Sequence, residues 1–545
     1  MINNTYKQYE CIEFKVGPDS VVTVTEPDGS CISLDSFKYQ EIAFSYDVEG
    51  LEHISPVGET EERVRYYPEK TGEYLLKINE KAYPFTVTQS EMHGFITISK
   101  KDARYFAFTD GSLFLPVGIN LALLRPVPLS DGTEFGLSGE YQYLGMREFE
   151  RWFKACAKNG VNMARIWLGY DYLCPDTNEA GVFIPEQFSK IDALVGLAEK
   201  YNIYLKFTID QFRFFDYDEA NTGRNVFRKR FYHNGTPCKN STEWLQNKVW
   251  QDAWLEKVKE LAKRYSGNPR IFMVELWNEM NCVGEMDDLN AWNQKMLPAV
   301  KKLFPKHLVT NSFGSLDSEY TKNKYNSFCW DMCDVMQMHR YLDQGAEYVS
   351  CQISPLRFIP EGIKILDKSD KPFLVAETGA VNTWHSAPFK YYHCDHRGIL
   401  FCDCVYTPLF CGSAGCGHIW HWDGTYVEAK NLYSYFKPFV NLIQDVDFEE
   451  ENFQPEIYED EEIILFILRG KTSCLIYCRN LADNWQRVLR DLEDDKPIRE
   501  KFISISLPEA VEKIDIWEDE SATCAYENKT LQIKNLKYGF FLKCK

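Results

Sequence analysis

The feature that most constrains the fold is an alternation of strand-like and helix-like segments between about residues 95 and 446. Short apolar runs of strand length recur along this stretch, and longer segments with helical spacing lie between them. In the segment from Glu186 to Tyr201, apolar residues fall at Phe188, Ile191, Leu194 and Val195, and the apolar run from Ile203 to Ile209 follows at once. Strands that alternate with helices of this length form parallel sheets.

Eight such strands predict a (β/α)8 barrel, because each strand can be followed by a helix that covers it. The count is not forced, since the fifth strand is short and the helix after it is poorly marked. The expected strands are Leu113–Asn120, Val161–Trp167, Ile203–Ile209, Ile271–Trp277, His307–Thr310, Asp334–His339, Pro372–Ala376 and Gly417–Trp422.

Segments on both sides of the barrel indicate antiparallel β structure. Residues 1–94 contain short alternating runs separated by turn residues, which predicts an N-terminal β-sandwich. Residues 447–545 begin acidic and continue as further β runs, which predicts a small C-terminal antiparallel domain. We therefore expect three domains, with the barrel at 95–446.

Composition excludes some partners. The net charge of −19 argues against nucleic acid, because phosphate contacts require Lys and Arg, and no apolar run reaches the roughly 18 residues of a membrane span. The polar start lacks the features of a secretory signal, so we expect a cytoplasmic protein with its 18 cysteines as free thiols. His393 and His396 near Cys402 match no zinc spacing, so we expect no metal and no cofactor. The oligomeric state is left open.

The ends of the predicted strands carry most of the candidate functional residues. In a barrel these ends converge on one face. Glycoside hydrolysis requires one carboxyl group as proton donor and a second as nucleophile or base, and Glu279 and Glu377 are the candidates. The complete set is Asn120, Arg165, Asp210, Asn278, Glu279, His339, Tyr341, Glu377, Trp420 and Trp422.

Structural roles are the alternative for each charged member of this set. Glu279 could cap the helix that follows, Arg165 could form a structural ion pair, and Asp210 could cap the turn after the third strand. In the functional interpretation, Arg165 keeps a nucleophilic glutamate ionised by lowering its pKa, and the proton donor needs a raised pKa.

The aromatic and polar members also have two interpretations. His339 and Tyr341 could form a strand end that is merely polar, or Tyr341 could bond to the nucleophile while His339 contacts the sugar or the acid. Trp420 and Trp422 lie two residues apart and should face one side of a strand. We expect one of them to fill the barrel and the other to form the floor of a sugar subsite.

This ordered set resembles the pattern of clan A glycoside hydrolases, which are retaining (β/α)8 enzymes that include the family 5 cellulases and mannanases. The resemblance spans roughly residues 95 to 445. It implies Glu279 as acid/base, Glu377 as nucleophile and Asn278 as the residue that holds the sugar 2-hydroxyl. The N-terminal sandwich followed by residues 110–120 also resembles a domain found ahead of such barrels in bacterial enzymes.

Two positions depart from the family 5 pattern. The third strand ends in Asp210-Gln-Phe212, where family 5 usually has a histidine nearby, and Met280 replaces the usual proline after Asn-Glu. Transfer of the family 5 substrate is therefore less secure than membership of the clan.

We therefore expect a retaining β-glycosidase that acts on β-linked gluco- or manno-configured oligosaccharides. An intracellular location favours short substrates, and the long loop 211–241 could form a substrate wall or a lid. The alternatives are a non-catalytic carbohydrate-binding barrel and a clan A glycosidase for a xylo-, galacto- or arabino-configured sugar. A metal-dependent hydrolase would need a His-x-His motif after the first strand, which the sequence lacks.

Overall fold

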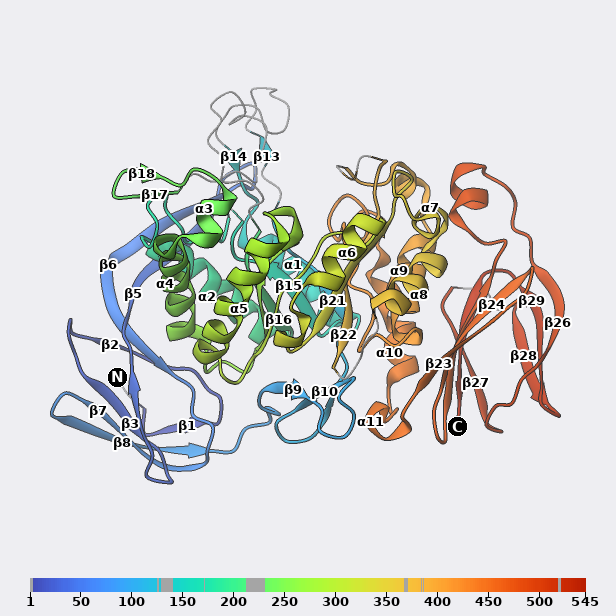
Figure 1. Cartoon of the computed structure of the whole chain (residues 1–545). Coiled ribbons are helices and arrows are strands. Elements are labelled where there is room, and N and C mark those ends of the chain that lie inside the picture. Colours follow the sequence, from blue (N-terminus) through green and yellow to red (C-terminus); the bar gives the residue numbers. More distant parts are fainter. Residues whose placement is uncertain are drawn as a thin grey trace.

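A computed structural model describes residues 3–124, 127–128, 141–170, 172–211, 231–366, 371–383, 385, 387–517 and 521–545. Figure 1 shows a central barrel with antiparallel sheets on both sides, and the two termini lie in these opposite flanking parts. None of the helices in the described ranges is long and apolar enough to cross a membrane.

Parallel strands form the ring of the barrel. Five neighbouring strands are β12 (Gly118–Asn120), β15 (Met163–Trp167), β16 (Tyr204–Asp210), β19 (Ile271–Trp277) and β20 (Leu308–Thr310), and a further parallel pair is β21 (Met336–Leu342) and β22 (Phe373–Ala380). The five strands meet this pair beside β20, where the Asp334 amide donates to the Val309 carbonyl at 2.9 Å. Ile419 bridges both Ile119 and Thr378 and closes the ring. This arrangement confirms the predicted (β/α)8 barrel.

Helices cover the outside of the ring and bury their apolar faces against it. In α1 the buried side chains of Phe149, Trp152, Phe153 and Cys156 follow helical spacing. The main covering helices are α1 (Met146–Lys158), α2 (Pro185–Lys200), α4 (Lys248–Tyr265), α5 (Met286–Leu303), α6 (Glu319–Ser327), α8 (Pro355–Leu366), α9 (Ile399–Phe410) and α10 (Phe436–Ile443).

Two predicted strands differ from the structure. The expected first strand is split around Pro116, which has no amide hydrogen to donate to a ladder. Its first part, β11 (Leu113–Phe114), joins a small antiparallel sheet with β9 (Ile96–Ile98) and β10 (Phe106–Phe108). The expected eighth strand is reduced to the bridging residue Ile419, because the backbone at His421 is left-handed, with a φ of 59°.

A predicted helix also differs. The expected helix from Thr242 to Tyr265 is broken into α3 (Ser241–Gln246) and α4. At the break, Asn247 is extended, and its side chain accepts a hydrogen bond from the Val249 amide, which caps α4.

Two sheets make up the N-terminal sandwich, and their inner faces share an apolar core. One sheet contains β1 (Thr5–Lys7), β8 (Lys81–Thr88), β7 (Gly72–Ile78), β3 (Val22–Thr25) and β4 (Cys31–Leu34). The other contains β2 (Ile12–Val16), β6 (Glu52–Tyr66) and β5 (Phe37–Tyr46). Both are antiparallel apart from the parallel edge pair β1 and β8.

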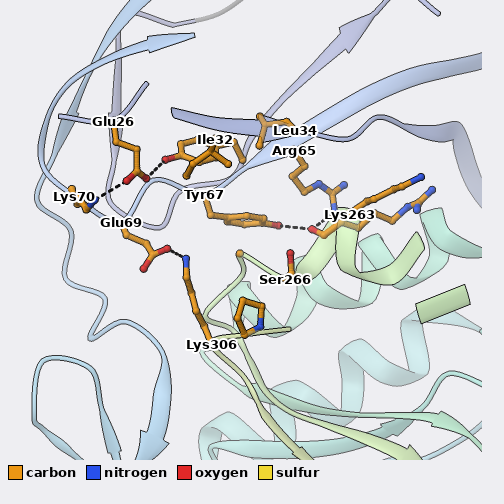
Figure 2. Close-up of a pocket in the computed structure, with 14 residues that line it drawn as sticks. Glu26, Ile32, Leu34, Arg65, Tyr67, Glu69, Lys70, Lys263, Ser266 and Lys306 are labelled. Atoms are coloured by element: carbon orange, nitrogen blue, oxygen red, sulfur yellow. Dashed lines mark hydrogen bonds and ion pairs between the residues drawn. The ribbon is translucent and has the colours of Figure 1, made fainter. Parts of the chain in front are cut away.

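Ion pairs attach this sandwich to the barrel. Arg65 on β6 contacts Glu13 within the sandwich, and its Nη1 lies 2.8 Å from Oδ1 of Asp192 on α2. A cavity of about 400 Å³ lies at the same junction. Figure 2 shows that Glu69 pairs there with Lys306 of the barrel. The sandwich is therefore attached to the barrel by charge pairs as well as by packing.

The C-terminal part is a second pair of sheets. The larger contains β23 (Gln454–Glu459), β24 (Ile463–Arg469), β25 (Cys474–Asn480), β30 (Gly539–Cys544) and β27 (Val511–Asp515). The smaller contains β26 (Ile498–Ser504), β29 (Thr530–Leu536) and β28 (Thr523–Glu527). Arg479 and Tyr477 on β25 bind the carboxylate of Asp403 on α9, at 2.8 and 2.7 Å. The larger sheet therefore packs on the barrel through a buried polar contact.

Replacing Arg65 with Ala should destabilise the protein by about 2–4 kcal/mol. Arg65 is 7% exposed, and its removal leaves Glu13 and Asp192 without their shared cation. Lys15→Ala is the matched control, because the Lys15 side chain is 67% exposed and its pair with Glu61 should contribute less than about 0.5 kcal/mol. Chemical denaturation measures both changes, and equal effects of the two substitutions would contradict this account of the junction.

Candidate active site

The two predicted catalytic glutamates lie together at the carboxyl ends of the barrel strands. One oxygen of Glu279, one of Glu377 and a ring nitrogen of His339 all lie within 4.8 Å of one another. Both glutamate side chains are nearly buried, at 7% and 4% exposure. Retaining glycosidases hold their carboxyl groups about 5–5.5 Å apart, whereas inverting enzymes need roughly 6.5–9.5 Å. The spacing fits the retaining geometry.

A β-bulge places Glu377 beside His339. The pairing of β21 with β22 shifts between Met338 and His339, so that His339 faces Glu377 and Ala376 is the additional residue. The carbonyl of Ala376 accepts a hydrogen bond from Asn120 Nδ2 at 3.1 Å. The bulge therefore turns the Glu377 side chain toward the paired carboxylate, and Asn120 satisfies the displaced backbone.

Glu279 directly follows β19 in a left-handed conformation, with φ 49° and ψ 52°. This region is uncommon for residues other than glycine. The Glu279 amide donates to Ser312 Oγ at 3.0 Å, which helps to hold the turn. Its side chain makes no capping hydrogen bond to the short helix that follows, so the structure does not support the alternative in which Glu279 is only a cap.

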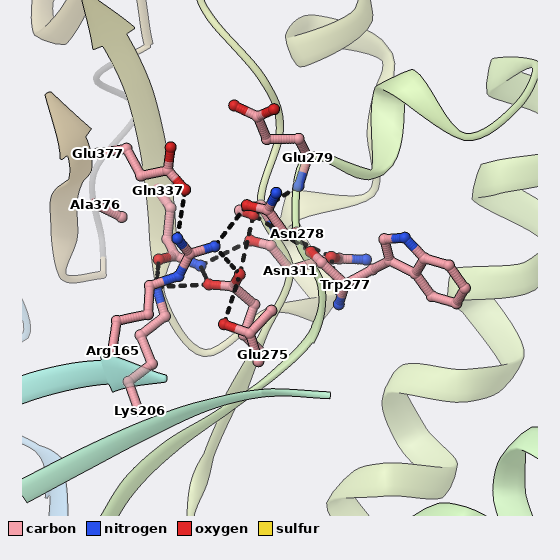
Figure 3. Close-up of polar contacts among 12 residues, drawn as sticks. Arg165, Lys206, Glu275, Trp277, Asn278, Glu279, Asn311, Gln337, Ala376 and Glu377 are labelled. Carbon is pink, nitrogen blue, oxygen red and sulfur yellow. Dashed lines mark hydrogen bonds and ion pairs between the residues drawn. The ribbon is translucent and has the colours of Figure 1, made fainter. Parts of the chain in front are cut away.

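Arg165 lies at the centre of the polar contacts under the glutamates (Figure 3). Its Nη1 donates to Glu377 Oε1, and its Nη2 donates to Glu275 Oε1 at 2.5 Å and to Asn278 Oδ1 at 2.7 Å. Burial disfavours the charged guanidinium, but Glu275 and Glu377 outweigh this effect and raise the pKa of Arg165. Arg165 therefore forms one ion pair with Glu377, the predicted nucleophile, and a second, structural ion pair with Glu275.

Sequence analysis missed Glu275 and Lys206, which complete this buried network. Lys206 Nζ lies 2.5 Å from Glu275 Oε2, and both side chains are fully buried. Burial raises the pKa of Glu275, but Arg165 and Lys206 outweigh it and hold that pKa well below its usual value. Burial lowers the pKa of Lys206 to about 8, against the attraction of Glu275. A charged residue inside an otherwise apolar strand is the sequence signal that could have identified both.

Tyr341 and His339 both contact the glutamates. Tyr341 donates its hydroxyl to Glu377 Oε2 at 2.6 Å, and burial together with Glu377 raises its pKa well above the usual value, so that the hydroxyl keeps its proton. His339 Nδ1 lies 3.1 Å from Glu279 Oε1 and 3.4 Å from Glu377 Oε2. Both residues therefore lie beside the two carboxylates.

Asn278 and Asn120 are held by other protein groups in this network. Asn278 Oδ1 accepts from Arg165, so any sugar contact falls to the amide NH2 group of its side chain. Asn120 accepts from Arg165 at 3.2 Å and donates to the carbonyls of Ala376 and His418. Asn120 is completely buried and joins three strand ends, which is a structural role.

Asp210 lies in a separate cluster. Both of its carboxylate oxygens lie 2.8 Å from Lys257 Nζ on α4, and Trp254 Nε1 donates to it at 2.7 Å. Burial, together with the nearby Asp176, raises the pKa of Asp210 to about 6 despite Lys257. These contacts attach α4 to the end of β16, so they give Asp210 a structural role, although not the turn cap that the sequence suggested.

The two predicted tryptophans have different environments. Trp422 is 3% exposed and packs edge-on against Trp152 of α1. Trp420 is only partly buried, and its ring lies 5.2 Å from that of Trp167 at the end of β15. Trp420 is therefore the candidate for a sugar platform, Trp422 belongs to the core, and Trp167 is a neighbour that sequence analysis missed.

Among the residues that the structure describes, two groups of side chains have donor types and spacing that could hold a metal ion. The first is Glu279, His339 and Glu377, and the second is Asp317, Asp343 and His385. In the first group, Arg165 and Tyr341 already donate to the Glu377 oxygens, so the protein itself supplies the partners of that carboxylate. Residues 212–230 of the predicted wall or lid lie outside the described residues.

Comparison with known proteins relates this barrel to a family. Residues 130–394 match the profile of the family described as Cellulase (glycosyl hydrolase family 5). Mannan endo-1,4-beta-mannosidase F of Aspergillus clavatus is 28% identical over 204 residues, which cover 35% of this chain and 44% of that protein. Mannan endo-1,4-beta-mannosidase 4 of Oryza sativa subsp. japonica is 28% identical over 179 residues, which cover 29% and 36%. The chain thus spans less than half the length of these relatives.

A solved structure from Bacteroides vulgatus ATCC 8482 shares the fold over the whole of both chains, with a TM-score of 0.53 and 13% identity. The fold and the residues at the strand ends define a barrel of the clan A glycoside hydrolase class. Within that clan, residues 130–394 resemble family 5 in particular, and the mannan endo-1,4-beta-mannosidases are similar to part of this chain. The departures at Asp210 and Met280 do not prevent this match.

Replacing the two tryptophans with Ala should have different effects. Trp420→Ala should weaken the binding of an oligosaccharide by about 1–2 kcal/mol, or five- to thirtyfold in KM, because a partly exposed ring is lost. Trp422→Ala should instead destabilise the fold by about 3–5 kcal/mol, because it leaves a cavity against Trp152. Kinetics and chemical denaturation of both variants test this, and the reverse pattern would exchange the two roles.

Proposed function

We propose that the protein is a retaining β-glycosidase in which Glu377 is the nucleophile and Glu279 is the general acid and base. The main observation is the close approach of the two carboxylates, with oxygens within 4.8 Å, together with the donors that face Glu377. Glu377 receives hydrogen bonds from Arg165 and Tyr341, and charged or hydroxyl donors of this kind suit a carboxylate that must act as a nucleophile.

These contacts fit a double displacement. The Glu377 carboxylate attacks the anomeric carbon while Glu279 protonates the departing glycosidic oxygen, which gives a covalent glycosyl-enzyme. Glu279 then removes a proton from water as the water attacks the same carbon, and the bond to Glu377 breaks. Tyr341 and Arg165 stabilise the Glu377 carboxylate before it attacks and again when it is released from the glycosyl-enzyme.

We infer that the substrate is a β-linked, manno-configured oligosaccharide, with gluco-configured chains as the next choice. The names of the two relatives, both mannan endo-1,4-beta-mannosidases, support this choice of sugar. A partly exposed Trp420 supports it in general terms, because an indole ring packs well against the apolar face of a pyranose.

Azide rescue of the two glutamate variants tests the assigned roles. Wild type, Glu279→Ala and Glu377→Ala are assayed on aryl β-mannoside, β-glucoside, β-xyloside, β-galactoside, mannobioside and cellobioside. Loss of Glu279 should slow hydrolysis by about 10²–10⁴-fold, and azide should restore turnover as a glycosyl azide of retained configuration. Loss of Glu377 should cost more, and azide should yield the inverted product.

Glu428→Ala is the control, since Glu428 bonds to Arg151 and Trp152 and has no contact with the paired glutamates. Rescue with the two configurations exchanged would reverse the two roles. Hydrolysis by both glutamate variants at the wild-type rate would show that the chemistry lies elsewhere. A wild type that binds the sugars but cleaves none would instead support a carbohydrate-binding barrel.

A further inference from the structure

Two charged side chains beneath the glutamates have no part in the reaction proposed above. Lys206 on β16 and Glu275 on β19 are fully buried inside the barrel. Buried charges are costly unless they are paired and hydrogen-bonded, and an apolar pair of similar size would serve a barrel core at least as well. The presence of both charges therefore calls for an explanation beyond packing.

Glu275 is bonded on both of its oxygens (Figure 3). Its Oε1 accepts from Arg165 at 2.5 Å, from Ser312 at 3.1 Å and from Thr208 at 3.2 Å. Its Oε2 lies 2.5 Å from Lys206 and accepts from Gln337 at 3.0 Å. Glu275 is thus shared by two cations.

Arg165 is shared in a corresponding way by two carboxylates. One of its terminal nitrogens, Nη2, faces Glu275, and the other, Nη1, faces Glu377. The four side chains therefore form an unbroken series, Lys206–Glu275–Arg165–Glu377, with alternating charge. The charge that Arg165 offers to Glu377 depends on how far Lys206 has already neutralised Glu275.

We propose that Lys206 and Glu275 are positioning residues for Glu377, and that they set the strength of its interaction with Arg165. The proposal rests on the nucleophilic role of Glu377 given above. Lys206 makes no ion pair with Glu377 among the described residues, so its charge reaches Glu377 along this series and through space.

The sign of each substitution follows from the charges. Lys206→Met leaves Glu275 with Arg165 as its one cation in the series, so the potential at Glu377 becomes more negative and its ionised form less favourable. Glu275→Gln leaves two cations for one carboxylate and has the opposite effect. The double variant restores the balance. The other titratable groups that face Glu377, which are His339, Tyr341 and Glu279, are the same in every variant.

The acidic limb of the pH profile measures this effect directly. We would determine kcat/KM against pH for wild type, Lys206→Met, Glu275→Gln and the double variant, on an aryl glycoside that the wild type cleaves. The limb should move to higher pH by about one unit in Lys206→Met and to lower pH by a similar amount in Glu275→Gln. In the double variant it should return to within about 0.3 unit of wild type.

Two controls separate this effect from a general one. Lys206→Arg keeps the charge, so it should leave the limb in place even if its size lowers kcat, and it tests the proposal should the Met variant not fold. Lys200→Met with Glu150→Gln alters an exposed ion pair on the outer helices by the same charges and should not move the limb. Acidic limbs of the two single variants that coincide with wild type, or that move in the same direction, would overturn the proposal.

A second measurement needs no turnover. We would measure the free energy of unfolding against pH for each protein with Glu377 and for the same protein with Glu377→Gln. The pH at which the difference between the two changes reports where Glu377 takes up its proton in the folded protein. Measured in each of the four backgrounds, it should show the same order of shifts as the kinetic limb. A wild type without glycosidase activity would refute the proposed function. If the pH midpoint of the Glu377 titration is the same in all four backgrounds, the role of Lys206 and Glu275 is refuted.

Discussion

The site depends on one guanidinium that serves two carboxylates. Arg165 connects Glu275, which lies deep in the barrel, to Glu377 at its rim, and Asn278 and Asn120 accept from the same group. A buried arginine is costly unless it is paired with carboxylates, and removing one partner from such a pair costs about 3–5 kcal/mol. The position of Glu377 is therefore coupled to the stability of the barrel interior.

Backbone irregularities complete what this network begins. Glu279 follows its strand in a left-handed conformation, and Glu377 follows a bulge at Ala376. Irregularities of this kind cost free energy and persist only where neighbours hold them. Ser312 supports the first, and Asn120 supports the second by binding the Ala376 carbonyl. Both supports are themselves linked to the network, since Ser312 also donates to Glu275 and Asn120 accepts from Arg165.

The sequence predicted most of the barrel because its strands are buried on both faces and read as apolar runs, as β19 does from Ile271 to Trp277. It failed where a local feature interrupts the pattern, at Pro116 and around His421. The strand-end rule brought Glu279, Glu377, His339, Tyr341 and Arg165 together, but it could not decide the partner of each side chain. Asp210 also closes a strand, yet its carboxylate is taken by Lys257 of α4, a pairing between distant segments that no local pattern specifies.

The two charged residues missed by sequence analysis share one property. Glu275 and Lys206 lie within strands rather than at their ends, where a charge is normally read as a weak point in an apolar run. Their function becomes visible only from the barrel register, which places Asn120 beside Arg165 and Arg165 beside Lys206, with Thr208 beside Glu275. The register thus sets two cations side by side on β15 and β16, and Glu275 of β19 supplies the carboxylate that both of them contact. Two like charges at one buried point are costly unless a carboxylate lies between them, so Glu275 is what allows Arg165 and Lys206 to share the barrel interior.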